Sequence, residues 1–158
     1  MQSEKLDLDG FDHKVLRVLA RNGRISITDL AREIGLSKSP TQARVRRLEG
    51  EGAIVGYRAM LDPIKLGFNH VAFVEVKLSD TKEKALQAFN EAVSKVQEIE
   101  QAHMIASNFD YLLKVRTSDM EAYRRVLGEK ISALPHVAST STFVAMEAVK
   151  EIGLGNVT

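Results

Sequence analysis

The chain has 158 residues, a length that allows one large domain or two small ones, and its composition is ordinary for a soluble globular protein. A net charge of +1 implies no bulk attraction to nucleic acid or to a membrane. The chain has no cysteine, which excludes a disulfide framework and a thiolate metal site and is consistent with a reducing compartment.

The N-terminal sequence is too polar for a signal peptide, and no apolar run approaches the length that crosses a membrane. We therefore expect a cytoplasmic protein without a membrane partner. The charges are unevenly distributed: residues 1–60 carry 11 Lys and Arg against 8 Asp and Glu, whereas residues 61–158 carry 11 against 13. The basic excess therefore lies in the first third of the chain, which predicts that any phosphate contact is made there.

The first third of the chain has the signals of three helices. Residues 1–8 are expected to form a polar arm, and Asp9 can cap a helix that runs to about Arg21 and ends at Asn22-Gly23. Ser26 with Asp29 has the spacing of a capping box, and Gly35 suits the C-cap of the short helix that follows.

A third helix restarts after this turn. Ser39 is the candidate cap and Pro40 the first helical residue, with Ser37 as a rival cap. At about 100° per residue, Ser39, Ala43, Arg46 and Gly50 point away from a buried stripe, and Arg44 lies nearer that stripe. A surface of small, amide and guanidinium groups suits a helix in the DNA major groove, although it also suits the solvated face of an ordinary amphipathic helix.

We predict that Arg46 reaches the DNA and that Arg44 braces the domain. The candidate DNA-binding residues are Ser37, Lys38, Ser39, Thr41, Gln42, Arg46 and Arg47.

The run AIVGYRAML at 53–61 resembles a strand, which would make the helical unit a winged variant with Tyr57 and Arg58 near the DNA backbone. Asp62-Pro63 then breaks the pattern. We expect a helix-turn-helix DNA-binding domain at 1–60 and a linker at 61–69.

The remainder changes pattern. Alternating strands are expected at 70–78, 99–106, 111–116 and 137–146, and helices at 82–96 and from Asp119 to about Leu134. This β-α-β-β-α-β order predicts a ferredoxin-like domain at 70–150, followed by a flexible tail at 151–158. Phe73 beside Val74 and Leu112 beside Leu113 make these strands apolar on both faces, which predicts at least a dimer. The predicted fold class is α+β.

Several segments together carry a family resemblance. They are GRIS at 23–26, LAREIGLS at 30–37, RVRRLEGEGAIVGY at 44–57, FDYLLKVR at 109–116 and FVAMEAVK at 143–150. The chain resembles the Lrp/AsnC (feast/famine) family of transcription regulators, close to its leucine-responsive members. The resemblance implies an N-terminal helix-turn-helix, a C-terminal ligand-sensing domain that dimerises through its sheets, and assembly into higher oligomers, often octamers.

The resemblance also implies an amino-acid effector near the turn at 107–110. Asp110 would pair with the ammonium group, and Ser107 and Asn108 would donate to the carboxylate. Thr140 and Thr142 are weaker candidates from the last strand. Family members usually have glycine where this chain has Ser107, and a serine held at positive φ would cost about 1 kcal/mol. The alternative is that SNFD is only a good turn sequence.

Metal and catalytic motifs are absent from the sequence. The four histidines form no i, i+3 or i, i+4 pair, and no nucleophile elbow, phosphate loop or dinucleotide fingerprint occurs. We predict no metal, no cofactor and no enzymatic activity. The leading interpretation is an effector-responsive, sequence-specific transcription regulator. The alternatives are a ligand-independent architectural DNA-binding protein and, third, an enzyme on a ferredoxin-like fold.

Overall fold

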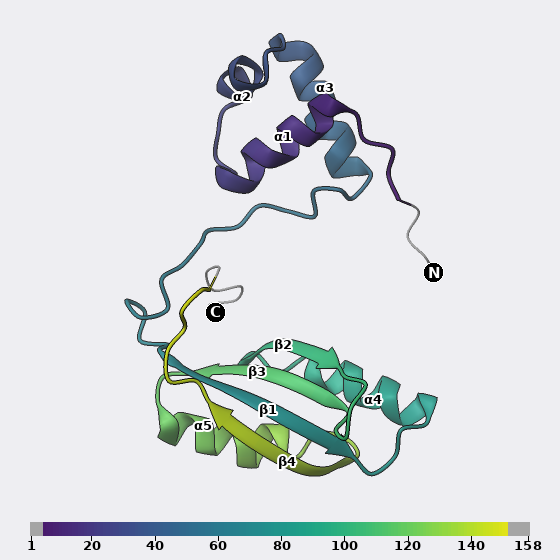
Figure 1. Ribbon diagram of the computed structural model, residues 1–158, viewed down its shortest axis with the longest axis vertical. Coiled ribbons are helices and arrows are strands. Elements are labelled where there is room, and N and C mark those ends of the chain that lie inside the picture. Colours follow the sequence, from purple (N-terminus) through teal and green to yellow (C-terminus); the bar gives the residue numbers. More distant parts are fainter. Residues whose placement is uncertain (1–4, 152–158) are drawn as a thin grey trace. The chain divides into compact units, whose positions relative to one another are not determined.

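The structure is a computed structural model that describes residues 5–151 (Figure 1). The chain divides into two compact units, one ending at Ala59 and the other beginning at Met60. Each unit has a hydrophobic core of its own, and the two cores share no residue. No helix within residues 5–151 is long and apolar enough to cross a lipid bilayer.

The N-terminal unit consists of three helices, α1 (Gly10–Arg21), α2 (Ile27–Ile34) and α3 (Lys38–Gly50). Asp9 caps α1 in a capping box, because its carboxylate accepts from the backbone of Asp12 while the Asp12 carboxylate accepts from the backbone of Asp9. Ser26 caps α2, and Gly35 ends it in the left-handed conformation with φ of 78°. The core that joins the helices contains Val15, Val18, Leu30, Ile34, Val45 and Leu48.

Two expectations for this unit are wrong. α3 begins at Lys38 with Ser37 as its N-cap, so Pro40 is the third helical residue and Ser39 is not the cap. Proline is tolerated there because the N–H groups of the first turn have no intrahelical acceptor. The run at 53–61 forms no strand either. A strand needs a partner, and the elements of the N-terminal unit that the structure describes are all helices.

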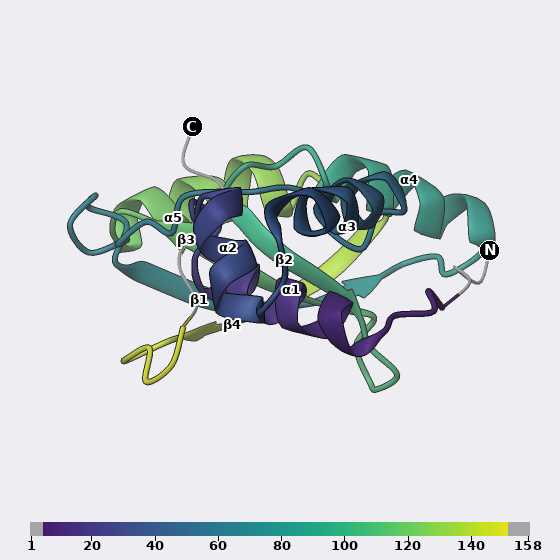
Figure 2. The same ribbon diagram turned by 90° about the horizontal axis from the view of Figure 1, so that it is seen from above.

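The C-terminal unit has the expected β-α-β-β-α-β order, so the predicted α+β fold class is confirmed. Its antiparallel sheet has the strand order β2-β3-β1-β4, and α4 and α5 lie on one face of it (Figure 2). A short π-helical turn, Leu127–Ile131, continues α5. The elements are β1 (His70–Leu78), α4 (Glu83–Val93), β2 (Ile99–Met104), β3 (Tyr111–Thr117), α5 (Met120–Val126) and β4 (Val137–Val144).

The two faces of the sheet have different environments. Val74 on β1 pairs with Leu113 on β3, and both side chains are fully buried under the helices with Phe89 of α4. The next pair along, Phe73 with Lys114, lies on the opposite face because side chains alternate along a strand. Neither α4 nor α5 covers that open face, where Phe73 and Phe143 are exposed.

Charged groups nevertheless cover part of the open face. Arg116 contacts Glu100 at 2.6 Å and Glu151 at 2.6 Å, and Lys114 also contacts both acids. Burial raises the pKa of Glu151, but the hydrogen bonds from Lys114 and Arg116 outweigh this and leave the pKa below its ordinary value. Glu151, which we expected to begin a flexible tail, is therefore fixed to β3, and the remaining residues of that tail lie outside the described range.

Candidate DNA-binding surface and effector turn

The outer face of α3 is the candidate DNA-binding surface. Ser37, Lys38, Ser39 and Arg46 are exposed, and Gln42 is half-buried beside them. Within residues 5–151, neither Lys38 nor Arg46 makes a salt bridge, so both are free to contact a phosphate or a base edge. Thr41 does not belong to this surface, because it is fully buried and its hydroxyl donates to the carbonyl of Ser37 at 2.9 Å. The expectation that Thr41 contacts DNA is wrong.

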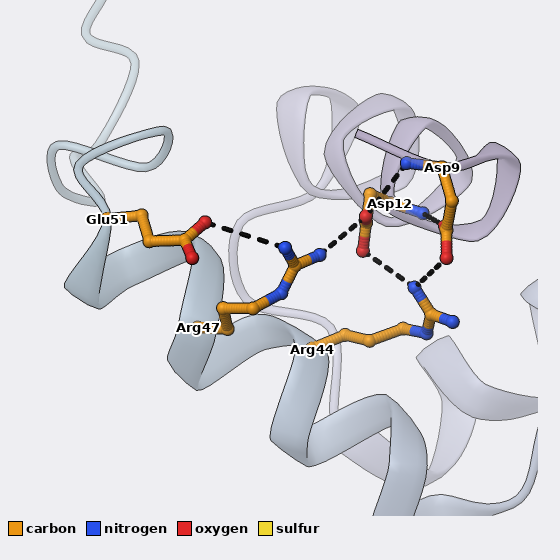
Figure 3. A network of polar contacts seen from close by, with 5 residues as sticks. All are labelled: Asp9, Asp12, Arg44, Arg47 and Glu51. Carbon is orange, nitrogen blue, oxygen red and sulfur yellow. Dashed lines mark hydrogen bonds and ion pairs between the residues drawn. The ribbon is translucent and has the colours of Figure 1, made fainter. Parts of the chain in front are cut away.

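The other two arginines of α3 point toward α1 (Figure 3). Arg44 Nη1 contacts Asp9 Oδ2 at 2.7 Å and Asp12 Oδ1 at 2.8 Å. Arg47 Nη2 contacts Asp12 Oδ2 at 2.5 Å, and its Nη1 lies 3.5 Å from Glu51. Arg44 thus has the bracing contacts that we expected of it. Arg47, which we expected to bind DNA, lies between two carboxylates instead.

Asp12 is the centre of this cluster, and the sequence interpretation did not identify it. Its side chain is 1% exposed, and both of its oxygens accept hydrogen bonds. Burial would raise the pKa of Asp12, but the bonds from Arg47, the Asp9 backbone and Arg44 lower it to about 2. Two pairs at i, i+3, namely Asp9 with Asp12 and Arg44 with Arg47, are the signal from which the cluster could have been found.

The low pKa predicts a loss of stability in acid. The folded pKa of Asp12, about 2, lies below the ordinary value of 3.8. The ionised carboxylate therefore stabilises the fold above about pH 4, and this contribution is lost as the pH falls toward 2. We expect a loss of about 2 kcal/mol from this group. Urea unfolding followed from pH 6 to pH 2 should show this loss in the wild type and not in Asp12→Asn. Parallel pH profiles for the two proteins would contradict it.

The segment after α3 folds back on the helices without forming a wing strand. The hydroxyl of Tyr57 donates to Glu49 at 2.8 Å, and its ring lies 3.3 Å from the position that a Cβ would take at Gly23. Burial and the neighbouring Glu49 carboxylate raise the pKa of Tyr57 to about 12, so the phenol stays protonated at neutral pH. Tyr57 is therefore attached to the helical unit beside the end of α3.

The candidate effector turn differs from the expectation in two respects. The Asp110 carboxylate accepts from the backbone of Leu78 at 2.7 Å, and the Asp110 backbone donates to Val76 at 2.9 Å. The Asp110 carboxylate therefore has a structural role, which the sequence analysis did not identify. Among the non-glycine residues of the described range, His136 alone has positive φ, so Ser107 is not in the strained conformation that we considered. The Ser107 hydroxyl instead contacts the side chain of Asn108 at 3.0 Å.

The two threonines of β4 lie on the helix-covered side of the sheet. Thr140 pairs with Val76 and Thr142 with Val74, whose side chains are buried under the helices. The hydroxyl of Thr142 contacts that of Tyr123 on α5. Because Val76 also pairs with Tyr111, Thr140 lies at the same end of the sheet as the turn. The structure thus brings Thr140 nearer to the turn than Thr142. Within residues 5–151, no cluster of three His, Asp or Glu side chains has the arrangement of a metal site.

Comparisons with known proteins agree with this arrangement. Residues 8–55 match the model of the winged helix-turn-helix DNA-binding family, and residues 71–154 match that of the Lrp/AsnC ligand binding domain. The proline dehydrogenase transcriptional activator of Rhizobium radiobacter is 62% identical over 148 residues, which cover 94% of this chain and 95% of that protein. The leucine-responsive regulatory protein of Escherichia coli K12 is 46% identical over 92% of this chain and 88% of its own.

A solved structure extends the similarity to the backbone. A transcriptional regulator of Neisseria meningitidis, crystallised as a complex with L-Met, matches with a TM-score of 0.85 and 28% identity over 92% of this chain and 94% of its own. One group of proteins thus matches both units of the chain. These are the helical unit, with α3 exposed, and the four-stranded unit. The chain belongs to the Lrp/AsnC family of DNA-binding transcription regulators.

Proposed function

We propose that the protein is a sequence-specific transcription regulator that reads DNA with the outer face of α3 and responds to an amino acid bound at its C-terminal unit. The observation that carries the DNA-binding part is the division of the α3 cations. Lys38 and Arg46 are exposed and make no ion pair within residues 5–151, on a face otherwise made of small and amide side chains. Such a face fits closely into the major groove, where arginine pairs with guanine.

We expect Arg46→Ala to weaken binding to the cognate DNA by about 1–3 kcal/mol if Arg46 pairs with a base. The exposed guanidinium makes no salt bridge within residues 5–151, so the circular dichroism spectrum should not change. The measurement is fluorescence anisotropy on a duplex selected by the wild type from a random pool, with a scrambled duplex as reference. Arg125→Ala, which removes the same charge from α5, is the matched control. Unchanged affinity in Arg46→Ala would show that α3 binds DNA through other residues.

The effector part of the proposal places an amino acid at the turn at 107–110. One Asp110 oxygen bonds to Leu78, which leaves the other available to an ammonium group. Ser107 and Asn108 precede Asp110 in the same turn. The Asn108 amide nitrogen can donate to a carboxylate, and the Ser107 hydroxyl can do so once it gives up its bond to the Asn108 oxygen at 3.0 Å. Groups that can bind the ammonium and the carboxylate of an amino acid therefore lie within the four residues 107–110. The family and the methionine complex of the Neisseria regulator support an amino acid as the ligand class.

We also propose a homodimer formed through the open face of the sheet, with assembly into higher oligomers such as octamers.

Asp110→Asn separates the two roles of this side chain. The amide oxygen can still accept from Leu78, so the fold should be retained, whereas loss of the negative charge should weaken effector binding tenfold to a hundredfold, or about 1.5–3 kcal/mol. Asp110→Ala should also destabilise the protein by about 1–3 kcal/mol, because the Leu78 N–H loses its partner.

Calorimetry with a panel that includes proline, leucine and methionine measures binding, and urea unfolding measures stability. An Asp110→Asn protein with full effector affinity would show that the ammonium site lies elsewhere. A wild type that gives no saturable heat with any amino acid would favour the architectural DNA-binding alternative.

A further inference from the structure

The four cations of α3 form two groups with different partners. Lys38 and Arg46 make no ion pair within the described residues, whereas Arg44 and Arg47 are bonded to the first turn of α1 (Figure 3). About 100° per residue separates the side chains of a helix, so Arg47 lies on the flank between the outer face and α1. From that position a free guanidinium could reach a phosphate of the bound DNA. Its contacts therefore decide whether it takes part in binding.

Those contacts hold Arg47 strongly. Asp12 is 1% exposed, and its two oxygens are fully used by Arg47, Arg44 and the Asp9 backbone. If Arg47 turned toward a phosphate, one oxygen of a buried carboxylate would lose its charged partner, which is strongly unfavourable. A phosphate contact gains only about a tenfold factor in affinity through counterion release at moderate salt, which is less than the loss of a partner costs a buried carboxylate. The ion pair with Asp12 should therefore persist when DNA binds.

The surroundings of this flank are also unfavourable to a phosphate. A shallow pocket of about 520 Å³ lies between α1 and α3 and is lined by Asp7, Asp9, Asp12, Pro40, Ala43, Arg44 and Arg47. Glu51 contacts Arg47 from the other side. Four carboxylates therefore surround two guanidinium groups, and the flank is net negative. A phosphate approaching it would be repelled, whereas Arg46 on the outer face makes no salt bridge with an acid of residues 5–151.

We propose that Asp12 is a specificity-determining residue of the DNA-binding surface, and that it acts by withholding Arg47 from the phosphate backbone. Arginine contacts to phosphate strengthen binding to every sequence alike. Because Arg44 and Arg47 stay bonded to α1, discrimination between DNA sequences depends on the outer face of α3. The affinity for DNA of any sequence is limited for the same reason. This inference rests on the proposed DNA-binding function and adds a positioning role for a residue that does not itself reach DNA.

The test uses the full-length protein, a duplex selected by the wild type and a scrambled duplex, each titrated from 50 to 200 mM KCl. Asp12→Asn keeps the shape of the side chain and removes the charged partner of Arg47 on α1, which leaves Arg47 only the longer contact with Glu51 at 3.5 Å, whereas Arg44 retains Asp9. One additional phosphate contact should steepen the slope of log K against log salt on scrambled DNA by about 1 and raise its affinity about tenfold at 100 mM. Discrimination between the two duplexes should fall by about the same factor.

Two further variants and a control isolate the cause. Arg47→Gln should leave the salt slope on scrambled DNA unchanged, and the double variant Asp12→Asn/Arg47→Gln should lose the gain of Asp12→Asn. Asp7→Asn removes a charge from the same pocket without releasing an arginine, because Asp7 makes no ion pair within residues 5–151. It should therefore change scrambled-DNA affinity less than twofold.

Either of two results would overturn the proposal. A shallower slope in Arg47→Gln would show that Arg47 already contacts phosphate, and an unchanged or shallower slope in folded Asp12→Asn would show that Asp12 does not withhold Arg47 from DNA. Melting followed by circular dichroism checks the fold, and if Asp12→Asn does not fold, Arg47→Gln decides alone. A wild type that selects no preferred duplex would contradict the proposed function, and the slopes on scrambled DNA would still test the role of Asp12.

Discussion

Replacing Phe89 with alanine should lower the free energy of unfolding of the C-terminal unit by about 3–5 kcal/mol. Phe89 lies on the inner face of α4, is fully buried, and its ring centroid is 4.4 Å from that of Tyr111 on β3. Removal of the ring leaves a cavity between the helix and the sheet, and the dispersion contacts that lined it are lost. The loss is a large fraction of the total stability of a small domain.

Urea unfolding monitored by circular dichroism measures the effect. Gln87→Ala, on the exposed side of the same helix, is the matched control and should cost less than about 0.5 kcal/mol. Because the two cores share no residue, the helical unit should keep its own unfolding transition. Equal stability losses in the two variants would show that Phe89 does not join α4 to the sheet.

Leu48→Ala should have the complementary effect and abolish DNA binding with the C-terminal unit intact. Leu48 is fully buried and attaches α3 to the other helices. Its truncation should cost about 2–5 kcal/mol. This unit has few residues in its core, so such a loss is enough to unfold much of it, and the recognition helix would lose the surface that orients it.

A gel shift with the selected duplex, together with sedimentation velocity, tests this result. We expect no shifted band and an unchanged assembly state for Leu48→Ala. Leu48→Met conserves the volume of the side chain, should cost less than about 1.5 kcal/mol, and should retain binding. A Leu48→Ala protein that binds DNA like the wild type would mean that α3 is held by other contacts.

Much of the fold could be predicted from the sequence because its signals are local. Asp9, Ser26 and Gly35 mark helix ends through hydrogen bonds to residues at most four positions away, and the structure has all three at those ends. The alternation of buried residues along β1 and the order of the elements likewise follow from short-range pattern. The prediction of a strand at 53–61 was wrong because a strand needs a partner strand, and a run of β-prone residues does not supply one.

The candidate site was less predictable because its contacts are long-range. The ion pairs of Arg44 and Arg47 with Asp12 join residues 32 and 35 positions apart, so helical angle alone could not show that Arg47, on the flank of the DNA-binding face, is bonded to α1. The bond from Leu78 to the Asp110 carboxylate likewise spans 32 positions. Thr41 and Leu48 are seven positions apart and therefore share one side of a helix, where the structure buries both. The inclusion of Thr41 among the DNA contacts disagreed with that geometry.

The bonds around Asp12 also constrain how this surface can change during evolution. A substitution that removes the carboxylate at position 12 leaves two guanidinium groups without their buried partner, and one that removes Arg47 leaves part of a buried carboxylate unpaired. Neither Asp12 nor Arg47 can therefore be substituted alone without a loss of stability. Arg46 has no such partner within residues 5–151, so its substitution should not lower the stability of the fold. New operator preferences should accordingly arise by substitution on the outer face of α3, while Asp12, Arg44 and Arg47 are inherited together.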